Sequence, residues 1–194
     1  MESLVAFTVL VALVGLERIV ELVVSVRNAA WSRARGGVET GLGHYPFMVV
    51  LHTGLLVGAL VEAWVRQPEV PAWLAWSMTL LVLASQALRW WCIGTLGRRW
   101  NTRVIVVPGL APVTGGPYRW MRHPNYVAVV VEGLALPLVH ASWITAVVFT
   151  VLNAGLLAVR IKVEDEALAS LPSSGPDSGP DSGHDSGHDR TVDA

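Results

Sequence analysis

A short polar and aromatic segment, GGPYRWMRHPNYVAVVVE, interrupts the apolar sequence between Gly115 and Glu132. Glycine permits unusual backbone angles and proline fixes its own, so residues 115–117 predict a turn. Pro124 suits the first turn of a helix and places His123 at the helix N-terminus, where free N–H groups favour an acidic group of a ligand. The segment therefore indicates either a binding site at the mouth of a membrane helix or a basic loop that anchors the helix to lipid headgroups.

Other ionisable side chains lie within apolar stretches, where a charge is costly and is by default a candidate for function. Glu17 and Glu21 are four residues apart, so they share one face of a helix. Arg89 lies at a similar depth in a later apolar stretch. We expect a buried ion pair between one of these glutamates and Arg89, with a role in helix packing rather than in catalysis.

Glu132 and His44 are the candidates for a general base. Glu132 follows Asn125 by seven residues and lies nearly in line with it on a helix, where a buried carboxylate accepts a proton or holds a hydroxyl. A structural hydrogen bond is the equal alternative for Glu132. His44 precedes the second apolar stretch, and His52 lies about 12 Å deeper along it. A hydrogen bond between helices is the commoner role for such a histidine.

Apolar stretches of membrane-spanning length must position these residues. The chain has 194 residues, of which 53% are hydrophobic, and a net charge of −1, which fits a membrane domain and gives no footprint for nucleic acid. Spans are expected at residues 3–26, 46–65 and 73–96, followed by a short extended piece at 103–107. A helical hairpin is expected over residues 124–163, broken near Pro137 and His140. The expected fold class is an all-α bundle of about five transmembrane helices.

The basic residues gather in the loops on one side of these spans. Ten Lys and Arg residues fall on that side, against Arg66 alone on the other. The positive-inside rule makes the basic side cytoplasmic and puts the N-terminus outside, in what we expect to be the inner membrane. Tryptophans near the ends of the spans are expected to contact membrane lipids. Residues 124–139 are short for a full crossing, so this helix is either shielded by protein or only partly inserted.

The composition changes abruptly at residue 170. Residues 174–189 are four tetrapeptides, SGPD, SGPD, SGHD and SGHD, with no apolar side chain to bury. They predict a disordered tail at residues 170–194 after a membrane domain at residues 1–169. A solvated tail is favoured over a weak metal site at His184 and His188, and no metal is expected.

The pattern Gly-x-Tyr and Arg-His-Pro-x-Tyr within residues 116–126 resembles the cofactor segment of the isoprenylcysteine carboxyl methyltransferase family, integral membrane enzymes that use S-adenosylmethionine. That family's second motif, Arg-x-x-x-Glu-Glu-x-x-Leu, is matched by Arg160, Glu164, Asp165 and Leu168. The resemblance is strongest over residues 110–168. It implies a methyltransferase with a cytoplasmic pocket for S-adenosylmethionine.

The resemblance also assigns roles to single residues. Arg160 matches the arginine assigned to substrate, and Glu164 the carboxylate that meets the cofactor. Carboxylate and aromatic groups suit the cofactor's amino group and sulfonium, while a histidine and helix N–H groups suit its carboxylate. Two positions depart from the family pattern, Ala128 for a frequent Gly and Asp165 for Glu. The implied cofactor-binding residues are Leu110, Ala111, Pro112, Val113, Tyr118, His123, Pro124, Asn125, Tyr126 and Glu164.

The first half of the chain looks like a bacterial branch of this family, linked to type III polyketide synthases, that O-methylates alkylresorcinols or alkylpyrones. The expected acceptor is therefore a lipophilic small molecule. Carboxyl methylation of an isoprenylcysteine-like substrate and N-methylation of a phospholipid are the alternatives. A phenol with a pKa of about 10 is mostly protonated at neutral pH, so a base such as Glu132 or His44 would help, whereas a pyrone enol needs less help.

Two other classes of function remain open. Some NADPH-dependent membrane reductases carry a similar His-Pro-Asn-Tyr, with a glutamate three residues after the tyrosine. This chain has Val129 at that position and Glu132 at the sixth, which favours the methyltransferase. A transporter or scaffold is the non-enzymatic alternative, although the spans show no repeated halves of the kind that transporters often have.

Overall fold

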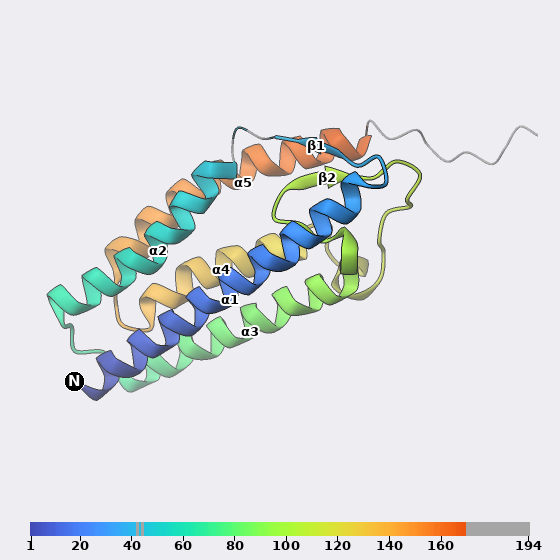
Figure 1. Cartoon of the computed structure of the whole chain (residues 1–194). Coiled ribbons are helices and arrows are strands. Elements are labelled where there is room, and N and C mark those ends of the chain that lie inside the picture. The colour runs from blue at the N-terminus through green and yellow to red at the C-terminus, as the bar shows by residue number, and fades with distance from the viewer. Residues whose placement is uncertain (42, 44, 170–194) are drawn as a thin grey trace, which may run out of the picture.

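The computed structural model describes residues 1–41, 43 and 45–169 of the chain. Within them, five long helices lie side by side as a bundle (Figure 1). The predicted base His44 and the predicted disordered tail lie outside the described residues. The predicted all-α membrane bundle is confirmed. The helices are α1 (Glu2–Arg33), α2 (Tyr45–Arg66), α3 (Ala72–Leu96), α4 (Pro124–Leu138) and α5 (Trp143–Ala169).

Three of these helices in the described part of the chain have the length and apolar composition needed to cross a membrane. They are α2, α3 with the short turn that follows it, and α5. Their outward faces carry many exposed apolar side chains, such as Val50, Leu80 and Val151. The chain is therefore an integral membrane protein.

The shortest helix, α4, lies in the middle of the bundle, between α1 and α3 on one side and α2 and α5 on the other (Figure 1). Small residues let α4 approach its neighbours closely. A Cβ atom on Gly133 would lie 2.0 Å from the ring of Phe149 on α5, so this position has no room for a side chain. Ala128 and Ala135 are likewise buried. Of the two alternatives for this short helix, packing on several sides favours shielding by protein over partial insertion.

Two cores of different character hold the bundle together. An apolar core lies toward the chain's N-terminus, and a polar network lies nearer the middle of the helices. Arg89 lies 3.5 Å from Glu21, which confirms the predicted ion pair. Glu132 of α4 also accepts a hydrogen bond from Arg89 and lies 3.4 Å from Arg18. The apolar core comprises Leu4, Phe7, Val11, Val14, Ala59, Ala63, Val82, Ala135, Leu136 and Val139.

Replacing Glu132 with alanine should destabilise the fold by about 3 kcal/mol, because it removes a carboxylate shared by Arg18 and Arg89 inside the bundle. Thermal unfolding of the purified protein in detergent measures this effect. Alanine at the exposed Glu69, between α2 and α3, is the matched control and should leave the midpoint unchanged. Equal midpoints for the two variants would contradict a structural role for the network.

The prediction that the first helix ends near residue 26 is wrong, because α1 continues to Arg33. Its last turns carry polar side chains that bind the connection after α3 instead of water. The Asn28 amide donates to the carbonyls of Gly97 and Trp100, at 3.1 and 2.7 Å. The hydroxyls of Ser25 and Thr102 are hydrogen-bonded to each other at 2.7 Å. These bonds attach the connection firmly to α1.

The extended piece expected at residues 103–107 is confirmed as β2 (Val104–Val106), and it pairs antiparallel with β1 (Val38–Thr40). The sequence did not reveal the partner strand. Glu39 of β1 accepts hydrogen bonds from Arg33 and Arg103, at 2.8 and 2.7 Å. These two bonds lower the pKa of the Glu39 carboxyl, so it stays ionised at neutral pH.

Candidate active site

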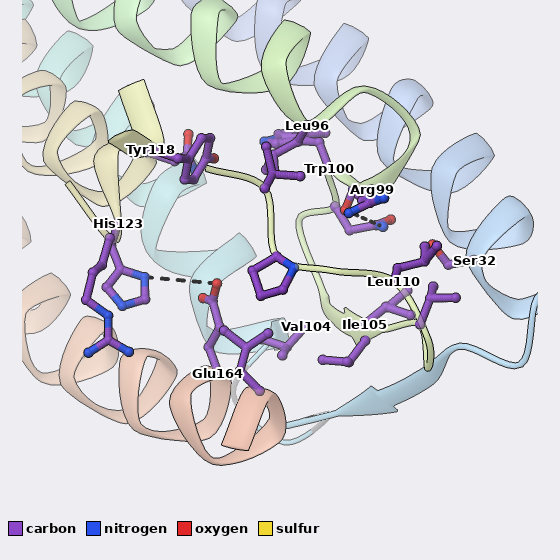
Figure 2. Close-up of a pocket in the computed structure, with 18 of the residues that line it drawn as sticks. Ser32, Leu96, Arg99, Trp100, Val104, Ile105, Leu110, Tyr118, His123 and Glu164 are labelled. Atoms are coloured by element: carbon purple, nitrogen blue, oxygen red, sulfur yellow. Dashed lines mark hydrogen bonds and ion pairs between the residues drawn. The ribbon is translucent and has the colours of Figure 1, made fainter. Parts of the chain in front are cut away.

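A cavity of about 540 Å³ lies at the end of the bundle that carries the two-stranded sheet (Figure 2). The connection between α3 and α4, the start of α4 and the last turns of α5 form its walls. Of the implied cofactor-binding residues, Pro124 alone does not line it, because its ring is buried at the first position of α4. The lining includes Leu110, Ala111, Pro112, Val113, Tyr118, His123, Asn125, Tyr126 and Glu164.

The two sequence motifs meet at one side of this cavity. The Tyr126 hydroxyl on α4 donates a hydrogen bond to the Glu164 carboxylate on α5. The ring of His123 stacks on that of Tyr126, with centroids 5.2 Å apart. Figure 2 shows His123 and Glu164 facing each other, with Nδ1 4.0 Å from Oε1. The two motifs that the resemblance assigns to one cofactor therefore lie together in the structure.

A tight turn directs the motif into the cavity. Gly116 opens the 3-10 turn η2 (Gly116–Arg119) with a φ of +53°. A Cβ atom at this position would lie 2.4 Å from the Thr95 hydroxyl, so glycine alone fits without displacement. Tyr118 follows, with its side chain beside Cys92. Burial raises the pKa of the Tyr118 phenol, so at neutral pH it stays protonated and able to donate a hydrogen bond.

Several cavity residues were absent from the predicted set. Arg99 donates to the carbonyl oxygen of Ala111 at 2.6 Å and so fixes the backbone run over residues 110–113. Arg122 lies 3.5 Å and His123 Nε2 3.4 Å from the Asp165 carboxylate. In the sequence analysis these arginines counted only among the basic loop residues that orient the chain in the membrane. Their place in a site depends on how the connection folds back on α5.

A second, smaller cavity of about 160 Å³ lies deeper, among the helices, and we call it the inner chamber. The larger cavity is called the outer cavity from here on. The two cavities meet at the residues that line both, which are Trp100, Asn101, Asn125, Tyr126 and Arg160. The other walls of the inner chamber mix apolar side chains with charged groups. The apolar members include Leu22, Val49, Leu56, Val129, Leu156 and Leu157.

Arg160 stands at the junction of the two cavities and is only 6% exposed. Its guanidinium donates to the Tyr126 hydroxyl at 2.8 Å and to the carbonyl oxygen of Thr102 at 2.7 Å. Among the described residues, no carboxylate lies within ion-pair distance of it. A buried cation without a countercharge is costly, so the junction suits a ligand with an anionic or partly anionic oxygen.

Asn125 gives a second indication of a ligand at the junction. Its side-chain oxygen is buried and has no hydrogen-bond partner in the described part of the chain. Asn125 also lines both cavities. Buried acceptors are nearly always paired, so this oxygen favours a ligand that brings a donor.

The predicted catalytic residues fall in different places. Arg160 lies in the site, whereas Glu132 lines neither cavity and is engaged by Arg18 and Arg89. His52, for which the sequence favoured a structural role, lines the inner chamber. The structure therefore brings Arg160 and His52, rather than Glu132, to the cavities.

Comparisons with known proteins point to the same family as the two sequence motifs. A sequence model of the isoprenylcysteine carboxyl methyltransferase family matches residues 78–170, which contain most of the cavity walls. The chain is 36% identical over 163 residues to the uncharacterized protein YpbQ of Bacillus subtilis, covering 84% of this chain and 96% of the relative. It is 24% identical over 155 residues to an uncharacterized protein of Haemophilus influenzae, covering 79% of this chain and 90% of the relative. No solved structure matches significantly.

Proposed function

Because the chain belongs to the isoprenylcysteine carboxyl methyltransferase family, we propose that it transfers a methyl group from S-adenosylmethionine to a lipophilic acceptor in the membrane. The observation that carries this proposal is the contact between Tyr126 and Glu164 at the wall of one large cavity. Each residue comes from one half of the family's two-part motif. Contact between the two halves is the arrangement that a shared cofactor requires.

The residues of the outer cavity fit S-adenosylmethionine. A cavity of about 540 Å³ lies in the usual size range for small-molecule sites. Glu164 offers a carboxylate to the cofactor's amino group, beside the aromatic rings of His123 and Tyr126. The backbone over residues 110–113, held by Arg99, offers polar groups to a nucleoside. When bound, the cofactor supplies a methyl group activated by its positively charged sulfur.

The inner chamber fits the head of the acceptor. Most of its walls belong to helices of the bundle, so a lipid would reach it from the bilayer with its chain among apolar side chains. Arg160, at the junction, would hold the acceptor's oxygen by its charge as that oxygen approaches the outer cavity. Alignment of an acceptor oxygen with the methyl group is the main contribution that methyl transfer requires of a protein.

An alkylresorcinol or an alkylpyrone is the acceptor that we propose. Both combine a ring bearing an ionisable hydroxyl with a long apolar chain, which suits a chamber of about 160 Å³ with charged and apolar walls. An isoprenylcysteine-like carboxylate would also suit Arg160 and is the second candidate. N-methylation of a phospholipid amine fits less well, because its positively charged product would lie beside the Arg160 cation at the junction.

Incubation of the purified protein with methyl-labelled S-adenosylmethionine tests this function. We expect a labelled methyl ether from an alkylresorcinol or an alkylpyrone, and a labelled methyl ester if an isoprenylcysteine analogue is the true acceptor. NADPH should neither be consumed nor displace the labelled cofactor. Oxidation of NADPH, or the absence of any labelled lipid, would contradict the proposal.

A further inference from the structure

One histidine in the inner chamber has a free ring nitrogen. His52 of α2 lines the chamber, with Nδ1 2.8 Å from the carbonyl oxygen of Met48, one turn earlier on the same helix. Its ring packs edge-on against Phe149, with centroids 5.3 Å apart. Among the described residues, no group is hydrogen-bonded to Nε2. Two contacts therefore fix the ring, and its second nitrogen remains available to a ligand.

The Met48 contact also selects the tautomer. A carbonyl oxygen only accepts hydrogen bonds, so Nδ1 must carry the proton. In the neutral ring Nε2 then has a lone pair and acts as a hydrogen-bond acceptor. A lipid hydroxyl in the chamber is a suitable donor to it.

Met48 also connects His52 to the junction. The Arg160 guanidinium donates to the Met48 sulfur at 3.2 Å, while the Met48 carbonyl oxygen accepts from His52. His52 is thus one helical turn, about 6 Å along α2, from a residue in contact with Arg160. An oxygen held near Arg160 and a lone pair on His52 can therefore belong to one acceptor site.

The carboxylates on and next to the chamber walls already lie beside arginines. Glu21 Oε2 lies 2.7 Å from Arg18, and Oε1 lies 3.5 Å from Arg89, within ion-pair distance although it accepts no hydrogen bond. Glu132 on α4 is engaged by the same two arginines. Among the described residues, His52 is therefore the basic side chain of the inner chamber that offers a lone pair outside any ion pair.

We propose that His52 is the general base for the acceptor hydroxyl, an inference that rests on the methyltransferase function proposed above. In the reaction, the acceptor's O–H bond breaks and its proton moves to Nε2. The oxygen's electron pair forms the new O–CH₃ bond, and the electrons of the broken S–CH₃ bond remain on sulfur. His52 then releases the proton, so the balance needs no further reactant.

Replacing His52 with glutamine tests the base directly, because an amide accepts a hydrogen bond but takes no proton. Turnover is measured with two acceptors of equal chain length, a 5-alkylresorcinol and a 4-hydroxy-6-alkyl-2-pyrone, whose enol is much more acidic. On the resorcinol, kcat should fall about 100-fold with KM little changed. On the pyrone, kcat should change less than about threefold.

A binding measurement gives a second readout without turnover. Quenching of intrinsic tryptophan fluorescence compares a 5-alkylresorcinol with its dimethyl ether on the cofactor-free protein in detergent. The native protein should prefer the free resorcinol about tenfold, since the ether has no hydroxyl to donate. His52→Gln should keep this preference, and His52→Leu should lose it.

His140→Gln serves as the matched control, since His140 is buried beside Phe7 at the opposite end of the bundle. Its activity ratio between the two acceptors should equal that of the native protein. Equal losses on both acceptors in His52→Gln, or an unchanged preference in His52→Leu, would overturn the proposal while leaving the methyltransferase function standing. A native protein that methylates neither acceptor would overturn both.

Discussion

Replacing Glu164 with glutamine is expected to weaken binding of S-adenosylmethionine about 100-fold. The carboxylate accepts a hydrogen bond from the Tyr126 hydroxyl and lies 4.0 Å from His123, so its oxygens are held at the wall of the outer cavity. A hydrogen bond to a charged group contributes roughly 1.5–3 kcal/mol, and each 1.4 kcal/mol is a factor of ten. Equilibrium dialysis with labelled cofactor measures the change.

Glu166→Gln is the matched control for this experiment. Glu166 lies on the same helix, two residues further on, with its side chain 65% exposed and 3.9 Å from Lys162. It does not line the cavity, so cofactor affinity should stay within about twofold of the native value. Equal affinities for the Glu164 and Glu166 variants would remove Glu164 from the cofactor site.

Replacing Arg160 with lysine is expected to lower kcat about 100-fold while cofactor affinity changes less than about fivefold. The guanidinium donates from different nitrogens to Tyr126 and to Thr102, and a lysine ammonium cannot reproduce that fork. The positive charge is kept but moves away from the junction. Radiometric methyl transfer gives kcat, and dialysis gives the affinity.

Arg66→Lys provides the comparison for the Arg160 variant. Arg66 ends α2 at the far end of the bundle, where it pairs with Glu62 at 2.8 Å. This variant should turn over like the native protein. If Arg160→Lys does so as well, the buried cation at the junction has no role in catalysis.

Much of the fold could be predicted because membrane helices have a strong local signal. Long apolar runs located four of the helices, and Pro124 marked the start of α4 correctly. The end of α1 was misplaced because Arg27 and Asn28 resemble a polar loop. Asn28 remains helical because it binds the backbone of residues 97 and 100, which are distant in sequence. No local pattern reveals such a partner.

The residues of the candidate site likewise fall into those that local sequence identifies and those that only the tertiary structure identifies. His123, Tyr126 and Glu164 in the outer cavity were identified from a spaced motif, which is a local property of the chain, whereas Arg99 and Arg122 were not. Glu132 looked like a base because it follows Asn125 on the same helix face, yet the structure pairs it with two arginines from other helices. His52 was predicted to have a structural role, because the sequence does not show the chamber that lies beside it in the packed bundle. Pairing and cavities are properties of the tertiary structure.

The central claim is that the outer cavity binds S-adenosylmethionine between the start of α4 and the end of α5. Ultraviolet crosslinking of the labelled cofactor to the purified protein, followed by peptide mapping, tests it directly. Label should appear on peptides that contain residues 110–126 or 160–168, and excess S-adenosylhomocysteine should abolish it. Label confined to the opposite end of the bundle, around residues 66–72, would contradict the claim.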